Sequence, residues 1–453
     1  ASDVYKRQGS VMLTGLVGER LFFADLLEKL KITVHVFRVG EYKSAVEPFS
    51  RNDMSDSARK DAKRLLGGIW QDMTAAIAQN RDIAVDSVIE FSNDFDRLLE
   101  NAQGDGARAT LDSQLVDGLL TKNAFRNKIG EIVGWQDNAL NGIGFQSYLA
   151  IHANRYSGSD EADQLIGILT VQGGIVKSGP AGADLANAEI LVDQIRMAKE
   201  DDQIKALVMR VDSPGGSAFA SELIREELSA LQEAGKPLVA SFGPLAASGG
   251  YWISTNADVI YAEPTSITGS IGVFGLVPNF SRSLNAIGVN ADGVSTGPLA
   301  RGMSAVGELS EQAQKILQLS IEHRYGEFIE LVATGRDMPE GAVEAIAQGR
   351  VWSGNAALEI GLVDELGDLD DAIARAAELA EMDNWRSVDV LPPLDPQSLI
   401  MMELMNAALG QSVLAQWLSH LPWLQSAKES LSMMSVFSDP RYMYAMCLSC
   451  KTL

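Results

Sequence analysis

Short apolar runs alternate with helix-patterned segments through the second half of the chain. The runs of strand length are 165–171, 206–211, 237–241 and 258–262. Two segments between them, 185–199 and 219–234, repeat apolar residues at helical spacing. Strands that alternate with helices predict βαβ units, a mostly parallel sheet and an α/β fold.

The pattern in the first half partly repeats that of the second. Without a gap, four apolar positions of one copy match four of the other: Phe23, Leu27, Leu30 and Ile32 match Phe280, Leu284, Ile287 and Val289. Each copy predicts a helix, a short turn and a strand, at 33–39 and at 290–295. Further on, Ser55 and Ser310 each precede a helix as an N-cap. The two halves are therefore predicted to be duplicated units.

The duplication predicts three regions. Residues 1–150 form an N-terminal repeat, 151–390 a C-terminal repeat, and 391–453 a Met-rich helical extension. The first copy lacks the strands that precede the repeat in the second, so we expect a chain truncated at its N-terminus. The extension predicts a helix docked on the core or on a sister subunit, with an adaptable hydrophobic contact as the alternative. No run of about 20 apolar residues predicts a membrane span.

Composition narrows the possible functions. The 453 residues are 46% hydrophobic and 21% charged, which is ordinary for a soluble protein. A net charge of −23 argues against a nucleic-acid partner, since phosphate binding needs clustered Lys and Arg. The only cysteines, Cys447 and Cys450, cannot fill a four-ligand zinc site and are an incidental pair or a small disulfide. The four histidines, predicted to be structural, form no ligand motif, so no metal is predicted: His35, His152, His323 and His420.

Two glycine-rich turns follow strands of the second half. Ser248 lies in Ala246–Trp252, where small neighbours would let a substrate approach its hydroxyl and Gly249 could donate to an oxyanion. The turn Asp212–Ser217 offers the N–H of Gly215 in the same way. Each turn alone is also explained as a tight turn with a helix cap.

Lys43 is the candidate base. It follows the strand at 33–39 among small or apolar residues, and the second copy has Ala300 at the equivalent position. A serine hydroxyl is a weak nucleophile until a base takes its proton, and a lysine can do so when burial keeps it neutral. A base from one copy and a nucleophile from the other predict a serine–lysine hydrolase.

Four segments together resemble the signal peptide peptidase A (protease IV) family in its long duplicated form. They are Phe37–Phe49, Asp212–Gly216, Ala246–Trp252 and Thr268–Val273. The resemblance implies a duplicated crotonase/caseinolytic-protease-like α/β fold, with parallel sheets flanked by helices. It implies Ser248 as nucleophile, Lys43 as general base, Ser270 as the hydroxyl that orients the amine, and Gly215 with Gly249 as the oxyanion hole.

The resemblance also implies the wider biology. The family degrades hydrophobic peptides such as cleaved signal peptides, and it uses no metal, nucleotide or organic cofactor. It forms homo-oligomers, here expected to be a tetramer, at the periplasmic side of the bacterial cytoplasmic membrane. The expected anchor is missing from this chain. Two rival hypotheses are a crotonase-like acyl-CoA enzyme, which needs a CoA pocket, and a non-catalytic peptide-binding scaffold.

Overall fold

A computed structural model gives the fold. It describes residues 11–136, 139–145, 147–148, 164–178, 185–296, 299, 304–391, 439, 441–447 and 450. The chain divides into two compact units, one of Ala1–Gly18 with Leu66–Ser157 and the other of Glu19–Leu65 with Gly158–Leu453. The boundaries predicted from the repeat (1–150, 151–390 and 391–453) remain a prediction, since this division follows compactness and not repetition.

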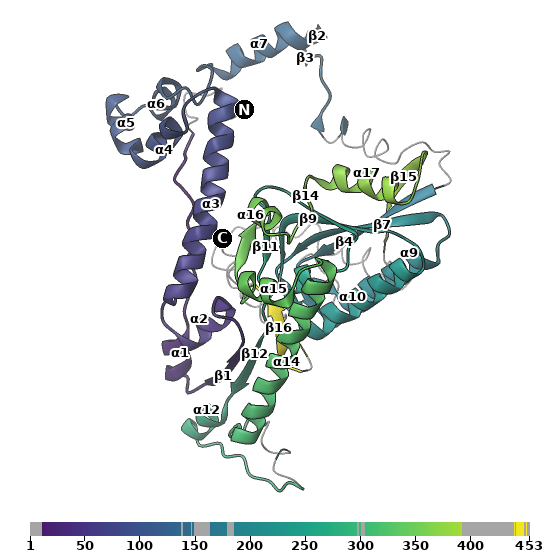
Figure 1. Ribbon diagram of the computed structural model, residues 1–453. Coiled ribbons are helices and arrows are strands. Elements are labelled where there is room, and N and C mark those ends of the chain that lie inside the picture. Colours follow the sequence, from purple (N-terminus) through teal and green to yellow (C-terminus); the bar gives the residue numbers. More distant parts are fainter. Residues whose placement is uncertain are drawn as a thin grey trace, which may run out of the picture. The chain divides into compact units, whose positions relative to one another are not determined.

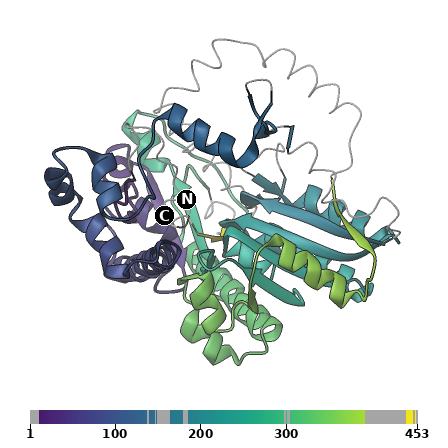
Figure 2. The same cartoon turned by 90° about the horizontal axis from the view of Figure 1, so that it is seen from above.

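The larger sheet of the second unit is mostly parallel. Its described residues form eight strands: β4 Gln164–Gln172, β7 Ile204–Ser213, β9 Leu238–Ala247, β10 Val259–Ala262, β11 Ile267–Gly269, β13 Val351–Ser353, β14 Glu365–Leu366 and β15 Trp385–Asp389. The main path runs β13-β11-β9-β7-β4-β15, and only β13 pairs antiparallel to its neighbour. The blue-green strands lie side by side when seen from above (Figure 2). Their apolar runs are buried on both faces, as expected of parallel strands.

Helices cover both faces of this sheet (Figure 1). On one face α9 Ala188–Glu200 and α10 Ala218–Glu233 join the main apolar core, and on the other α17 Leu369–Leu379 covers a second cluster. The remaining helices of this unit that lie in the described residues are α1 Ala24–Lys29, η1 Ser44–Val46, α2 Glu47–Ser50, α11 Gly249–Trp252, α12 Ser281–Ala286, α14 Glu311–Gly335, α15 Glu340–Ile346 and α16 Gly354–Glu359. The predicted α/β fold of parallel strands flanked by helices is confirmed.

A smaller mixed sheet joins distant parts of the same unit. Its strands, in spatial order, are β1 Thr33–Arg38, β12 Phe274–Asn279, β16 Met443–Met446, β8 Gly215–Ser217, β5 Gly174–Val176 and β6 Leu185–Asn187. β1 pairs antiparallel with β12, which brings the residues after β1 beside the glycine-rich turns of the second half. This pairing positions Lys43.

The first unit is mainly helical. α3 Asp56–Arg81 starts in the second unit and continues into the first, because the boundary falls between Leu65 and Leu66. The elements that follow are α4 Val85–Asn93, α5 Phe95–Asn101, α6 Gly106–Asp112, α7 Lys122–Val133, β2 Trp135–Gln136 and β3 Ala139–Leu140. Phe91, fully buried, packs its ring 5.1 Å from that of Phe95. Of the helices in the described part of the chain, none has the length and apolarity to span a membrane.

The structure differs from the sequence-based predictions in two segments, and some predicted features lie outside the described residues. The strand predicted at 290–295 is wrong: these residues are irregular and exposed, and have no paired strand in the described structure, whereas β1 forms because β12 supplies its partner. In the region 391–453, residues 443–446 form a strand and not a helix, since β8 and β12 offer backbone partners on both sides. Ala300, His152, His420 and residues 392–438 lie outside the described residues.

Candidate active site

Lys43 lies at the turn that follows β1. Its backbone N–H donates to Gly40 O at 3.3 Å, and it is the N-cap of η1. The preceding residue, Tyr42, donates its N–H to Gln348 O at 2.9 Å and stacks its ring under the Arg350 guanidinium. Backbone and side-chain contacts from the second half therefore hold this turn, and the Lys43 side chain is only 1% exposed.

The amine of Lys43 has three oxygen neighbours. Nζ lies 2.7 Å from Ser248 Oγ and donates to Ser270 O at 2.9 Å and Ser270 Oγ at 3.0 Å. No carboxylate contributes to its ionisation, and burial lowers the pKa of Lys43 well below its usual 10.5. Desolvation disfavours the charged form, so the site favours a neutral amine.

Ser248 stands where strand β9 ends and helix α11 begins. Its N–H donates to Gly269 O at 2.8 Å, and its carbonyl accepts from Trp252 N at 2.7 Å. The residue has φ 56° and ψ −111°, in a region that costs a side chain about 1–3 kcal/mol. This strained turn sets the hydroxyl at the end of the sheet, facing Lys43.

Ser270 follows β11, the strand next to β9. Its φ is 53°, and its N–H donates to Arg350 O at 2.6 Å. Both oxygens of Ser270 therefore reach the Lys43 amine from one fixed backbone position. Ser270 is 1% exposed, so water does not compete for these bonds.

The two candidate oxyanion glycines are neighbours. Gly249 is the first residue of α11, and the N–H groups of a helix's first turn have no carbonyl partner within the helix. A Cβ atom at Gly215 would overlap the Gly249 nitrogen, so the two backbones are in close approach. The Gly215 N–H itself donates to Ser213 Oγ at 3.1 Å. Gly249 is therefore the better-supported donor, and a role for Gly215 requires that this bond be shared or exchanged.

Two further glycines make room for Lys43, and the sequence alone did not single them out. A Cβ atom at Gly349, where φ is 82°, would lie 2.6 Å from the backbone nitrogen of Lys43. A Cβ atom at Gly272 would lie 3.2 Å from Lys43 Cδ. Gly272 belongs to a segment already noted in the sequence, Thr268–Val273. Gly349 is an isolated glycine between α15 and β13, where no motif marks it.

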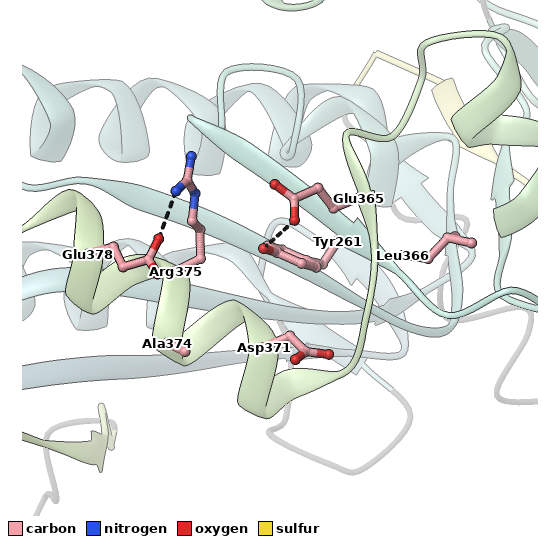
Figure 3. A pocket seen from close by; sticks show the side chains of 7 residues that line it. All are labelled: Tyr261, Glu365, Leu366, Asp371, Ala374, Arg375 and Glu378. Carbon is pink, nitrogen blue, oxygen red and sulfur yellow. Dashed lines mark hydrogen bonds and ion pairs between the residues drawn. The ribbon is translucent and has the colours of Figure 1, made fainter.

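A separate pocket of about 310 Å³ does not contain these residues (Figure 3). It lies where α17 faces β10 and β14, and Tyr261 donates to Glu365 Oε2 at 2.8 Å inside it. Burial and this bond raise the pKa of Tyr261 to about 12. Arg375 pairs with Glu378 at 2.7 Å. The polar groups named here pair with one another, and neither Lys43, Ser248 nor Ser270 lines this pocket.

The structure also locates the histidines and cysteines that were considered as catalytic or metal-binding residues. His35 lies on β1, and burial lowers its pKa. His323 lies on α14 with an exposed side chain, 3.4 Å from Glu327. Cys447 and Cys450 form a disulfide, one of the two outcomes expected for this pair. In the described ranges, His, Cys, Asp and Glu form no group of three that could hold a metal ion.

A serine hydroxyl facing a buried amine at glycine-rich turns is typical of hydrolases that work by acyl transfer. Comparison with known proteins agrees with this class. The model of peptidase family S49 matches residues 2–132 and 230–383. The chain therefore belongs to peptidase family S49 and is a protease.

Three relatives match most of the chain. Protease 4 of Haemophilus influenzae is 38% identical over 99% of this chain and 74% of its own length. Protease 4 of Salmonella typhi is 41% identical over 98% of this chain and 71% of its own length. The chloroplastic serine protease SPPA of Arabidopsis thaliana is 31% identical over 82% of this chain and 54% of its own length.

Proposed function

We propose that this protease is a serine endopeptidase in which Lys43 is the general base and Ser248 the nucleophile. The observation that carries the proposal is the 2.7 Å separation of Lys43 Nζ and Ser248 Oγ in a buried setting. A neutral amine has two N–H groups and one lone pair. Its two bonds to Ser270 use the N–H groups, so the lone pair is left to accept the Ser248 proton.

The reaction follows from this arrangement. The Ser248 proton passes to Lys43 Nζ as Oγ bonds to the scissile carbonyl carbon, whose C=O electron pair moves onto oxygen. When the tetrahedral species collapses, the C–N bond breaks and Lys43 returns the proton to the leaving amine. Water then attacks the acyl-enzyme with Lys43 again as base, and Ser248 regains its proton.

Two groups assist this reaction in the proposal. Gly249, and Gly215 after release from Ser213, donate N–H groups to the oxyanion, and each such donor is worth about 2.7–4 kcal/mol. Ser270 is a positioning residue. A lysine side chain is long and flexible, and the two bonds from Ser270 fix its amine in one place.

We also propose hydrophobic peptides, cleaved signal peptides among them, as substrates. Apolar side chains around the site support this, since Ala45, Val46 and Phe274 form one cluster just beyond Lys43. The family resemblance supports a homo-oligomer, a tetramer, and an attachment to the bacterial cytoplasmic membrane on its periplasmic side. The Cys447–Cys450 disulfide is consistent with an oxidising compartment.

Substitution of the two reacting groups tests the proposal. We expect Ser248→Ala and Lys43→Met each to lower kcat/KM for a fluorogenic hydrophobic peptide by roughly 10⁴-fold or more. The matched control is Lys236→Met, since Lys236 also has a pKa lowered by burial but donates only to Ala198 O and Asp201 O. It should retain full activity. Equal turnover by the parent and either site variant, with all chains folded, would reject the Ser248–Lys43 pair.

A further inference from the structure

One turn contacts both of the segments that carry the buried amine and its hydroxyl partner. It spans residues 348–350, between α15 and β13. The carbonyl of Gln348 accepts from the N–H of Tyr42 at 2.9 Å. The carbonyl of Arg350 accepts from the N–H of Ser270 at 2.6 Å. This turn therefore fixes two segments that are distant in sequence.

Arg350 reaches both segments on its own. Its guanidinium carbon lies 4.3 Å from the centroid of the Tyr42 ring, and its Nη2 donates to Tyr42 Oη at 3.1 Å. Its Nη1 donates to Ala345 O at 3.1 Å, which ties the side chain to α15. A planar guanidinium can stack through its face and donate from its edge, and both properties are used here.

These contacts close a ring around the amine. Lys43 Nζ donates to both oxygens of Ser270, whose N–H donates to Arg350 O. The Arg350 side chain holds Tyr42, and the chain then continues directly into Lys43. Each member of the ring is therefore held from two sides, and a shift of one would displace the next.

The turn itself is supported by two helices. Gln348 has φ 56° and Gly349 has φ 82°, both in the left-handed region, which is strained for a residue with a side chain. The N–H of Gln348 donates to Tyr325 Oη at 3.3 Å, and its Nε2 donates to Glu344 Oε1 at 3.0 Å. Tyr325 in turn donates to Glu344 Oε2 at 2.8 Å. α14 and α15 thus hold the backbone that carries Arg350.

The position of Arg350, and not its charge, acts on the amine. Burial is the cause of the lowered pKa of Lys43, and no charged group adds to it. The carboxylates on the elements beside the amine are engaged elsewhere: Glu41 by Ser57, Glu47 by Arg38 and Glu344 by Tyr325. The ionisation of Lys43 therefore depends on how deeply its side chain is held in the protein.

We propose that Arg350 is a positioning residue of this protease. Through Tyr42 and Ser270 it fixes the Lys43 amine at the distance that proton transfer requires. The proposal rests on the function assigned above to Lys43 and Ser248. An arginine is specified here by geometry, because an ammonium group cannot stack on a ring and donate to two acceptors in the same way.

Arg350→Ala removes the side-chain contacts and keeps the carbonyl. We expect kcat for a fluorogenic hydrophobic peptide to fall roughly 10- to 100-fold at unchanged KM, because a displaced base costs rate and not binding. The pH at which kcat/KM reaches half of its plateau should also move up, since a less buried amine has a higher pKa. A loss of stability alone would not move this midpoint.

Two further variants separate geometry from charge and from general destabilisation. Arg350→Lys keeps the charge but loses the planar group, so its kcat and pH midpoint should resemble those of Arg350→Ala. It also serves if Arg350→Ala does not fold. The matched control is Arg126→Ala, which removes a guanidinium from over the Trp135 ring, at 5.0 Å, in the other compact unit. It should keep the parent's kcat and pH midpoint.

A double-mutant cycle tests whether Arg350 acts through Tyr42. Tyr42→Ala should lower kcat as Arg350→Ala does, whereas Tyr42→Phe keeps the stacked ring and should lose less. In the Tyr42→Ala background, Arg350→Ala should change kcat by less than about twofold, since the contact that it removes is already absent. Additive losses in the double variant would overturn the proposal.

An acylating probe separates this proposal from the proposed function. The probe should label Ser248 in the parent, fail to label Lys43→Met, and label the Arg350 variants slowly. If the folded Arg350 variants are labelled at the parent's rate with an unchanged pH midpoint, Arg350 does not position the base, while the function stands. Parental activity of Arg350→Lys would equally reject a role in geometry. If the folded parent is not labelled at Ser248, the proposed function fails, and the role of Arg350 with it.

Discussion

The Lys43 amine has exchanged water for three serine oxygens. Burial penalises its charged form, and no carboxylate contributes to its ionisation to restore that charge. An exposed lysine would be protonated at neutral pH and could not accept a proton. In the proposed mechanism, the low exposure of this one side chain makes the lysine usable as a base, and Ser270 adds direction to it.

The pH dependence of the reaction follows from the lowered pKa of Lys43. The base must be unprotonated, so kcat/KM should rise with pH as Lys43 loses its proton. Because burial lowers this pKa, the rise should level off far below the usual lysine value of 10.5. The measurement is kcat/KM against pH with an uncharged peptide, with circular dichroism to check folding. A plateau reached only near 10.5, or an acid optimum, would contradict a buried neutral amine.

At the scale of elements, the turn after β1 is held by a second turn between α15 and β13. Gly349 lies against the Lys43 backbone so closely that no side chain fits, and its N–H donates to Ile271 O at 2.7 Å. The positive φ of Gly349 adds a second reason for glycine. Two turns far apart in sequence therefore fix the position of the Lys43 backbone, from which the side-chain amine extends.

A comparison of Gly349→Ala with Gly361→Ala should separate the effect of close packing on Lys43 from the effect of backbone strain. Both residues have φ near 80°, but a Cβ atom at Gly361 would meet only Met338 Sδ, at 3.8 Å. Backbone strain alone should cost Gly361→Ala about 1–2 kcal/mol of unfolding free energy and leave kcat unchanged. Gly349→Ala should lose stability and also most of its kcat, since Lys43 is displaced. Equal kcat in the two variants, measured beside urea unfolding curves, would show that Gly349 does not position Lys43.

The sequence could predict the parts of this site that local motifs encode. Ser248 and Ser270 each lie in a glycine-rich segment after a strand, and the repeat drew attention to Lys43. The partners that arise from tertiary pairing carry no such mark. Residues 443–446 are four apolar positions whose strand exists only because β8 and β12 flank it. By the same logic, the strand predicted at 290–295 is absent from the described structure because no neighbouring strand pairs with it.

On the scale of the whole molecule, the candidate site belongs to one of two compact units. Lys43, Ser248, Ser270 and β16 all lie in the unit of Glu19–Leu65 and Gly158–Leu453. Each unit has buried apolar residues of its own, with Phe91 in the first and Phe328 in the second. The stability of one core is therefore expected to matter more for the chemistry than that of the other.

Two cavity-forming substitutions test this independence. Phe91→Ala and Phe328→Ala each remove a fully buried ring and should cost about 3–5 kcal/mol in their own unit. The Phe328 ring packs 4.5 Å from Trp252 in α11, so its loss should lower kcat/KM as well as the melting temperature. Phe91→Ala should melt its unit earlier in calorimetry and keep the Ser248 labelling rate. Loss of labelling in both variants would show that the site depends on the two units together.

The left-handed backbone of Ser248 has a consequence for how such a protease can lose its activity. At that φ an achiral residue bears no steric penalty, while any side chain does. The proposed nucleophile thus occupies a position whose backbone conformation favours glycine. A single Ser248→Gly substitution would therefore remove the hydroxyl and relieve the steric penalty at the same time.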